Sequence, residues 1–246
     1  MSLAIIAREF FKLFGLEFRR IRPAHEEIPR LVHFLKEARI STVIDVGANI
    51  GQFAESLFRA GYEGRVVSIE PIPSANETAR RRSARYGGRW LVLEPVAASS
   101  ATGTAAFNVS ANLVSSSLRK VTSETVEAAE DAALREVISV RTALLDDILD
   151  RAGVEAGTLF LKIDTQGAEG DVLAGAARTL MRTGGVKLEL SLADLYEGQM
   201  SPAQLDEMIR NMGFVCWDLI PGFRNRISGR LLQYDAIYFR RAGVLS

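Results

Sequence analysis

From Thr42 onward, segments with the pattern of strands alternate with segments with the pattern of helices. The strand-like runs are rich in β-branched and apolar residues and occupy residues 42–46, 65–70, 90–98, 158–164 and 186–192. Such alternation predicts parallel βαβ units and a doubly wound α/β sheet. The chain closes with FVCWDLI and QYDAIYFR, which have no helix between them. We therefore expect a mostly parallel seven-stranded sheet with an antiparallel C-terminal strand.

The remaining segments predict two additions to this sheet. Residues 1–41 are expected to form an N-terminal helical appendage, and the main domain then spans residues 42–241. A stretch rich in Ser, Thr, Ala and Glu interrupts the alternation at about residues 108–137. We expect this insertion to be partly helical, with residues 112–136 forming a mobile cover over the carboxyl ends of the strands. Ser115, Ser116 and Ser117 would then offer hydroxyl groups to a ligand, and the alternative is an ordinary surface helix hairpin.

Composition excludes several classes of protein. The 30 basic and 30 acidic residues balance, so no overall field favours nucleic acid. The single cysteine, Cys216, excludes an internal disulfide framework. His25 and His33 are not spaced as a ligand pair, so we expect no metal site that depends on them. No run approaches the roughly 18 apolar residues of a membrane span.

The N-terminal segment has apolar residues at helical spacing, among them Leu3, Ile6 and Phe10, and it carries several basic residues. One interpretation is a helix that packs on the main domain or on a partner subunit. The other is a basic amphipathic helix on a membrane surface. The localisation expected from these features is cytoplasmic, with or without peripheral contact at the inner membrane face.

A glycine-containing turn follows the first strand, in the stretch TVIDVGANIGQF at residues 42–53. In open α/β sheets ligands bind beyond the carboxyl ends of the strands, and glycine there lets a ligand approach the backbone. The dinucleotide fingerprint needs glycine at positions 47, 49 and 52, but the chain has Gly47, Asn49 and Gln52. A pyrophosphate cradle is therefore poorly supported, and a plain tight turn is the structural alternative.

The pattern Asp45, Gly47, Asn49, Gly51 resembles the first motif of class I S-adenosylmethionine-dependent methyltransferases. In that comparison the acid at the end of the strand reaches the methionyl amino group, directly or through water. Glu70 ends the next strand and is placed to accept hydrogen bonds from both ribose hydroxyls, although NAD-binding proteins share such an acid.

A second stretch is more specific. LKIDTQGAEGDVLAGA, at residues 161–176, together with LELSLADLYEGQ, at residues 188–199, resembles the FkbM family of methyltransferases. The hallmark K-x-D-x-x-G-x-E is matched by Lys162, Asp164, Gly167 and Glu169, and VLAGA follows it. The resemblance extends from about Thr42 to Arg240, and it is weaker in the first 41 residues and in the insertion.

The resemblance implies a Rossmann-like fold and transfer of a methyl group from S-adenosylmethionine to a hydroxyl of a sugar, glycolipid or natural product. Asp164 and Glu189 end strands near the switch point and are the two candidate bases for removing the hydroxyl proton. Lys162, inside an apolar strand, is expected to pair with Glu189 or to contact substrate. The predicted cofactor-binding residues are Asp45, Gly47, Asn49, Gly51, Glu70, Pro71, Val96, Ala97 and Asp164.

Three alternatives stay open at this point. Magnesium held by Asp164 and a neighbouring acid could orient a diol, although the prediction is a site without metal. An NAD-dependent oxidoreductase and a non-catalytic binding module could use the same fold. The partners expected are a small-molecule, glycan or glycolipid acceptor, with no nucleic acid, and formation of a homo-oligomer is left open.

Overall fold

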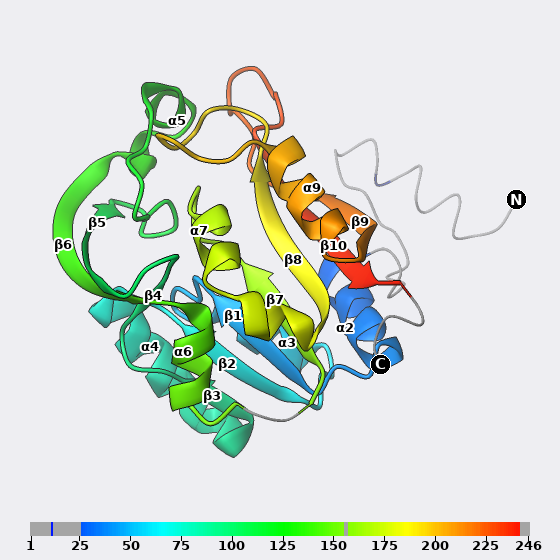
Figure 1. Ribbon diagram of the computed structural model, residues 1–246. Helices are drawn as coiled ribbons and strands as arrows, with labels where there is room; N and C mark the ends of the chain where they lie inside the picture. The colour runs from blue at the N-terminus through cyan, green and yellow to red at the C-terminus, as the bar shows by residue number, and fades with distance from the viewer. Residues whose placement is uncertain (1–10, 12–25, 155–156, 242–246) are drawn as a thin grey trace, which may run out of the picture.

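A computed structural model describes residues 11, 26–154 and 157–241 of the chain (Figure 1). Its α-helices are α2 (Glu27–Glu37), α3 (Gln52–Arg59), α4 (Pro73–Ser83), α5 (Ser123–Ala128), α6 (Leu145–Arg151), α7 (Glu169–Ala174), α8 (Ala177–Met181) and α9 (Pro202–Asn211). Its strands are β1 (Thr42–Val46), β2 (Arg65–Ile69), β3 (Trp90–Val92), β4 (Ala97–Ala98), β5 (Gly103–Ser110), β6 (Leu134–Ala143), β7 (Leu159–Ile163), β8 (Thr183–Ser191), β9 (Phe214–Pro221) and β10 (Gln233–Arg240). Two 3₁₀ helices lie at Ala84–Arg89 and Glu130–Ala132.

Seven strands form the central sheet in the order β3-β2-β1-β7-β8-β10-β9. β1 pairs in parallel with β2 and β7, and β7 pairs in parallel with β8. β10 is antiparallel to both of its neighbours, β8 and β9. The fold class predicted from the sequence, a mostly parallel seven-stranded sheet of the Rossmann-like type with an antiparallel C-terminal strand, is confirmed.

A second sheet, which the sequence analysis did not predict, has three strands in the order β4-β6-β5. Residues 90–98, expected as one strand, divide between the sheets, because β3 pairs with β2 and β4 pairs with β6. The insertion therefore lies between the antiparallel strands β5 and β6, and it contains α5 and the 3₁₀ helix at Glu130–Ala132. This hairpin curves away from the central sheet, on the left of Figure 1.

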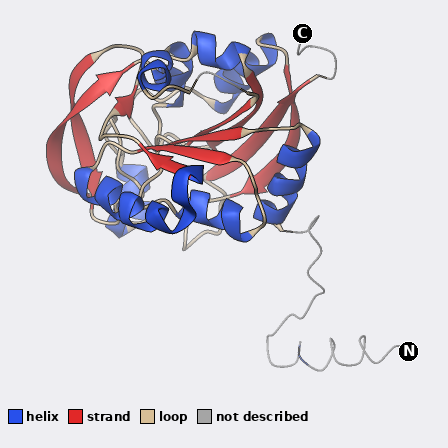
Figure 2. Ribbon diagram, turned by 90° about the horizontal axis from the view of Figure 1, so that it is seen from below, coloured by secondary structure: helices blue, strands red, loops and turns tan. Residues whose placement is uncertain are grey.

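Helices cover both faces of the central sheet, as the view in Figure 2 shows. One apolar cluster packs α2, α3 and α4 on one face, and it includes the fully buried Leu31, Leu57 and Phe160. The other cluster packs α6 to α9 on the opposite face, with Ile44 and Leu161 at its centre. Because both faces of β1 and β7 are covered, their residues are buried throughout, as parallel strands require.

The segment after β7 forms two short helices, α7 and α8, and Gly175 lies between them. A β-carbon at this position would collide with the backbone carbonyl of Ser99, just after β4. The glycine therefore allows the two helices to bend around the start of the second sheet.

The predicted N-terminal appendage falls largely outside the described residues. Within its limits, α2 packs Leu31, Val32 and Leu35 against the central sheet. Because α2 runs opposite to β1, its first residue, Glu27, lies at the carboxyl edge of the sheet and contacts Lys187. Among the described residues, no helix combines the length and the apolar character that crossing a membrane requires.

Candidate functional site

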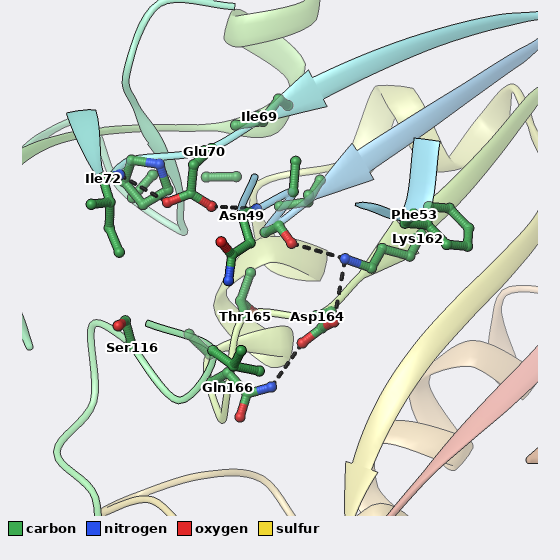
Figure 3. A pocket seen from close by; sticks show the side chains of 18 of the residues that line it. Asn49, Phe53, Ile69, Glu70, Ile72, Ser116, Lys162, Asp164, Thr165 and Gln166 are labelled. Atoms are coloured by element: carbon green, nitrogen blue, oxygen red, sulfur yellow. Dashed lines mark hydrogen bonds and ion pairs between the residues drawn. The ribbon is translucent and has the colours of Figure 1, made fainter. Parts of the chain in front are cut away.

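A cavity of about 230 Å³ opens beyond the carboxyl ends of β1, β2 and β7. The strand ends, the start of α3 and the loop that follows β5 form its walls. Seven of the predicted cofactor-binding residues line it: Gly47, Asn49, Glu70, Pro71, Val96, Ala97 and Asp164. In Figure 3, Glu70 and Ile72 lie on one side of Asn49, and Lys162, Asp164 and Phe53 lie toward the other. The cavity therefore brings together residues of both predicted motifs, the glycine turn after β1 and the segment that carries Asp164.

The glycines of the turn serve the close packing of strands around this cavity. Gly47 has φ +75°, and a β-carbon there would collide with the backbone carbonyl of Asp164. Gly51 has φ +84° and is the N-cap residue of α3. A β-carbon at Gly51 would collide with the ring of Trp90. Gly47 lines the cavity, whereas Gly51, predicted to do so, does not.

Glu70 follows β2 and is only 4% exposed. Its carboxylate accepts hydrogen bonds of 2.8 Å from the backbone amides of Asn49 and Ile72 (Figure 3). Burial raises the pKa of Glu70 to about 7, although these two hydrogen bonds oppose the rise. Each carboxylate oxygen keeps a lone pair beyond the one that its amide uses, so the group can accept two further donors from the cavity.

Asp45 does not line the cavity, and its side chain is fully buried. It forms an ion pair of 3.0 Å with Lys162, which stands opposite it in the pairing of β1 with β7. Lys162 also contacts Asp164 at 3.3 Å and donates to the carbonyl of Gly47 at 2.9 Å. The geometry thus makes Asp45 a partner of Lys162 and differs from the expected contact of Asp45 with the cofactor.

The ion pairs of Lys162 with Asp45 and Asp164 replace the expected pairing with Glu189, and Lys162 also lines the cavity. Burial lowers the pKa of Lys162, but Asp164 and Asp45 together raise it above its ordinary value, so the ammonium stays charged. A buried lysine with two carboxylates and a carbonyl has all three donors satisfied. Lys162 therefore holds the turn after β1 and the end of β7 together beneath the cavity.

Asp164 directly follows β7, and its side chain is 36% exposed. The Nε2 atom of Gln166 donates to Asp164 Oδ1 at 2.8 Å, while Lys162 contacts Oδ2 (Figure 3). Burial raises the pKa of Asp164, but Lys162 and the Gln166 amide outweigh burial and lower it. The carboxylate is thus ionised and held from two sides.

Glu189 lies on β8 but does not line the cavity. The Gln166 amide lies between Glu189 and Asp164, because its Nε2 atom also donates to Glu189 Oε2 at 2.6 Å. Gln233 donates to the same oxygen at 2.8 Å, and the Tyr196 hydroxyl donates to Gln166 Oε1. Burial and the charge of Asp164 raise the pKa of Glu189 well above its ordinary value. Of the two candidate bases, Asp164 lines the cavity and its pKa is lowered, whereas Glu189 does not line the cavity and its pKa is raised.

Sequence reasoning missed several residues of the cavity. Its apolar end includes Ile72, Phe107, Leu113, Val114 and Leu118, and its other end includes Gln52, Phe53, Ser56 and Lys187. Phe107 belongs to the second sheet, which no local pattern predicted, and Ile72 lies between β2 and α4. Leu113, Val114 and Leu118 lie in the segment 112–136 that was expected to form a cover, although the sequence did not single them out. Gln52 and Phe53 begin α3 directly after the glycine turn, and this position in the sequence could have indicated that they line the site.

The loop after β5 covers the cavity with Leu113, Val114, Ser116 and Leu118. Its serine hydroxyls bind within the protein: Ser116 accepts from the backbone amide of Ser110 at 3.0 Å, and Ser117 donates to the carbonyl of Thr165 at 3.1 Å. The later part of the insertion is anchored elsewhere, because Thr125 on α5 donates to the carbonyl of Leu195 at 2.6 Å. The covering segment is therefore residues 113–118, and its serines shape the loop.

Comparison with known sequences gives the family. The sequence model of the methyltransferase FkbM domain matches residues 45–216. A relative described as 2-O-methyltransferase NoeI, from Sinorhizobium fredii, is 28% identical over 213 residues, which cover 84% of each chain.

Solved structures with a similar arrangement share little sequence. Magnesium protoporphyrin IX methyltransferase (ChlM) from Synechocystis, solved with bound SAM, is 12% identical and has a TM-score of 0.46, and the alignment covers 98% of each chain. The methyltransferase domain of bacterial CtHen1-C is 9% identical with a TM-score of 0.47, over 90% of this chain and all of that one. The family assignment therefore depends on the sequence match, and by that match the chain belongs to the FkbM methyltransferase family.

Proposed function

We propose that this methyltransferase transfers a methyl group from S-adenosylmethionine to a hydroxyl oxygen of a sugar, glycolipid or natural product. The observation that carries the proposal is one cavity with the Glu70 carboxylate on one side and the Asp164 carboxylate on the other. The description of the relative as a 2-O-methyltransferase supports oxygen as the acceptor atom. It also supports an acceptor with more than one hydroxyl.

The cavity fits the chemistry of this cofactor. Glu70 has free lone pairs for the two ribose hydroxyls, and it is held by two backbone amides. The apolar residues Ile72, Val96, Phe107 and Leu118 beside Glu70 offer a surface for a flat adenine ring. When bound, the cofactor would supply an electrophilic methyl group on its sulfonium.

Asp164 is the base in this proposal. Gln166 separates two carboxyl groups whose pKa values are shifted in opposite directions, downward for Asp164 and upward for Glu189. Such a divergence assigns different roles to two neighbouring acids. Asp164, ionised and facing the cavity, can accept a proton, whereas Glu189, with its raised pKa, helps hold the Gln166 amide.

The acceptor hydroxyl would lie against Asp164. With the cofactor bound, the Asp164 carboxylate would accept the hydroxyl proton while the oxygen takes the methyl group and the thioether is released. Because the lowered pKa makes Asp164 a modest base, alignment of oxygen, methyl and sulfur must supply much of the acceleration. Lys162 and Gln166 contribute to that alignment by fixing both oxygens of the carboxylate.

Calorimetric titration with S-adenosylhomocysteine, with NAD and with buffer tests the proposal. Binding of S-adenosylhomocysteine alone would support it, and binding of NAD in its place would favour an oxidoreductase. The acceptor can then be sought by incubating the protein with methyl-labelled S-adenosylmethionine and an extract of its source organism. Label that appears in an ester or an N-methyl group would contradict transfer to a hydroxyl.

Cofactor affinity should depend on pH through Glu70. Ribose hydroxyls donate to the ionised carboxylate, and the pKa of about 7 means that half of the free protein holds Glu70 protonated at that pH. The apparent dissociation constant of S-adenosylhomocysteine should therefore be about tenfold higher at pH 6 than at pH 8. Calorimetry in buffers of different ionisation enthalpy should also detect proton release near pH 7. In Glu70→Gln the dissociation constant should vary much less with pH. If it varies as much as in the wild type, the pH dependence comes from another group, such as Glu169, whose pKa is also raised to about 7.

The covering segment 113–118 should be less accessible to protease when ligand is bound. Leu113 and Leu118 line the cavity, and trypsin sites follow immediately at Arg119 and Lys120. S-adenosylhomocysteine should slow cleavage there by about tenfold if the loop must open for cleavage. Cleavage after Arg226, on the loop between β9 and β10, is the internal control. Equal protection at both cleavage sites, or protection at neither, would contradict the idea that segment 113–118 covers the bound ligand.

A further inference from the structure

The cavity contains a second lysine whose position the proposed function has not used. Four charged side chains line it: Glu70, Lys162, Asp164 and Lys187. Lys187 lies on β8, directly opposite Lys162 in the pairing of β7 with β8. The ring of Phe53 lies near both ammonium groups, at 5.7 Å from Lys162 and 5.5 Å from Lys187. The end of the cavity that Phe53 marks therefore has two buried cations.

The two lysines differ in the donors that remain free. Lys162 has three partners, Asp45, Asp164 and the carbonyl of Gly47. Lys187 contacts Glu27 at 2.8 Å and Asp235 at 2.9 Å. An ammonium has three donors, so Lys187 keeps one that no acceptor among the described residues takes.

Lys187 is only 6% exposed, so its remaining donor cannot turn freely into solvent. Burial lowers its pKa, but Asp235 and Glu27 raise it above its ordinary value, and the group stays charged. A buried charged donor without an acceptor is unfavourable. Because Lys187 lines the cavity, the cavity is where such an acceptor would lie.

The first turn of α3 offers donors at the same end. Gln52 and Phe53 line the cavity, and α3 begins at Gly51, whose lack of a side chain leaves the helix without a side-chain cap. The first amides of a helix have no partner within the helix and favour an anion. Lys187 and the start of α3 are therefore two separate sources of donors at the end of the cavity that Phe53 lines.

We propose that Lys187 and the first turn of α3 bind the carboxylate of the cofactor's methionyl tail. The inference rests on the proposed function, because it assigns one group of the proposed cofactor to one end of the cavity. The distribution of charge agrees with that orientation. The nucleoside would lie at the Glu70 end, and the tail, which bears an ammonium and a carboxylate, would lie near Asp164 and Lys187.

Ligands that differ by single groups test this assignment. Three are needed: S-adenosylhomocysteine, its decarboxylated analogue, which retains the amine, and 5′-methylthioadenosine, which lacks the whole tail. Wild-type protein and Lys187→Met are titrated with each by calorimetry. In Lys187→Met the affinity for S-adenosylhomocysteine should fall about 10–100-fold, the range for a hydrogen bond to a charged group. The affinities for the other two ligands should change by less than about threefold.

Removing Lys187 leaves Glu27 and Asp235 without their cation, which threatens folding. A triple variant, Glu27→Gln, Asp235→Asn and Lys187→Met, removes that repulsion and should show the same selective loss. An equal loss for all three ligands, or no loss, would overturn the assignment to the carboxylate. If the wild-type protein binds none of the three nucleosides, the proposed function itself fails, so the two failures are distinguishable.

Discussion

Replacement of Asp164 by asparagine should reduce turnover by about 10²–10⁴-fold, the contribution of a positioned general base. Asparagine keeps the shape of the side chain and removes the proton acceptor. The affinity for S-adenosylhomocysteine should fall by much less, because Glu70 and the apolar end of the cavity are unchanged. Single-turnover rates and calorimetric dissociation constants measured on the same preparations separate the two effects.

The matched control is Asp147→Asn. Asp147 lies on α6, is 39% exposed, pairs with Arg178 and does not line the cavity. This change should leave turnover within about twofold of wild type, as surface substitutions commonly do. If Asp164→Asn stays active and Glu189→Gln loses activity, the base is Glu189, and the orientation proposed for Gln166 is wrong.

Glu70→Ala should weaken binding of S-adenosylhomocysteine by about 1–3 kcal/mol, the range for hydrogen bonds to a charged acceptor. The change removes both ribose contacts at once and leaves the amides of Asn49 and Ile72 without their acceptor. We expect 5′-methylthioadenosine to lose affinity to the same extent, because it has the same ribose. The two ligands therefore distinguish Glu70 from Lys187, because replacing Lys187 should weaken only the binding of the ligand that has the methionyl carboxylate.

Glu94→Ala is the control for that measurement, because Glu94 is 73% exposed, pairs with Arg80 and does not line the cavity. Thermal unfolding of each variant shows whether the fold is retained. A Glu70→Ala protein that is folded and binds S-adenosylhomocysteine with an unchanged dissociation constant would refute the role in ribose binding.

The central sheet was predictable because its signals are local. The residues of β1 and β7 fall within the runs identified in the sequence, since buried parallel strands leave continuous apolar patterns. β6 was missed because it pairs only with β5 and β4, and its first residues, from Leu134 to Val137, are exposed. These first residues therefore lack the alternation that marks a strand half-buried on a core, which is present only from Ile138 to Thr142.

The same distinction applies to the site. Glu70 and Asp164 follow strands, and the position at a strand end is visible in the sequence. The ion pair of Asp45 with Lys162 depends on β1 lying beside β7, which is more than 100 residues away in the chain. Glu189 was indistinguishable from Asp164 as a base until Gln166 was placed between them. These contacts, which join residues far apart in the chain or depend on the conformation of a loop, are not visible in the sequence.

The site has one part that the contacts of Lys162 fix at the ends of β1 and β7, and another part that lies outside the central sheet. The lysine lies on a strand and contacts Asp164, so one oxygen of this carboxylate is held from the central sheet through the register of β1 and β7. The residues that cover the cavity belong to a hairpin outside the central sheet. Changes in the hairpin can therefore alter the wall of the cavity while the contact between Lys162 and Asp164 stays in place.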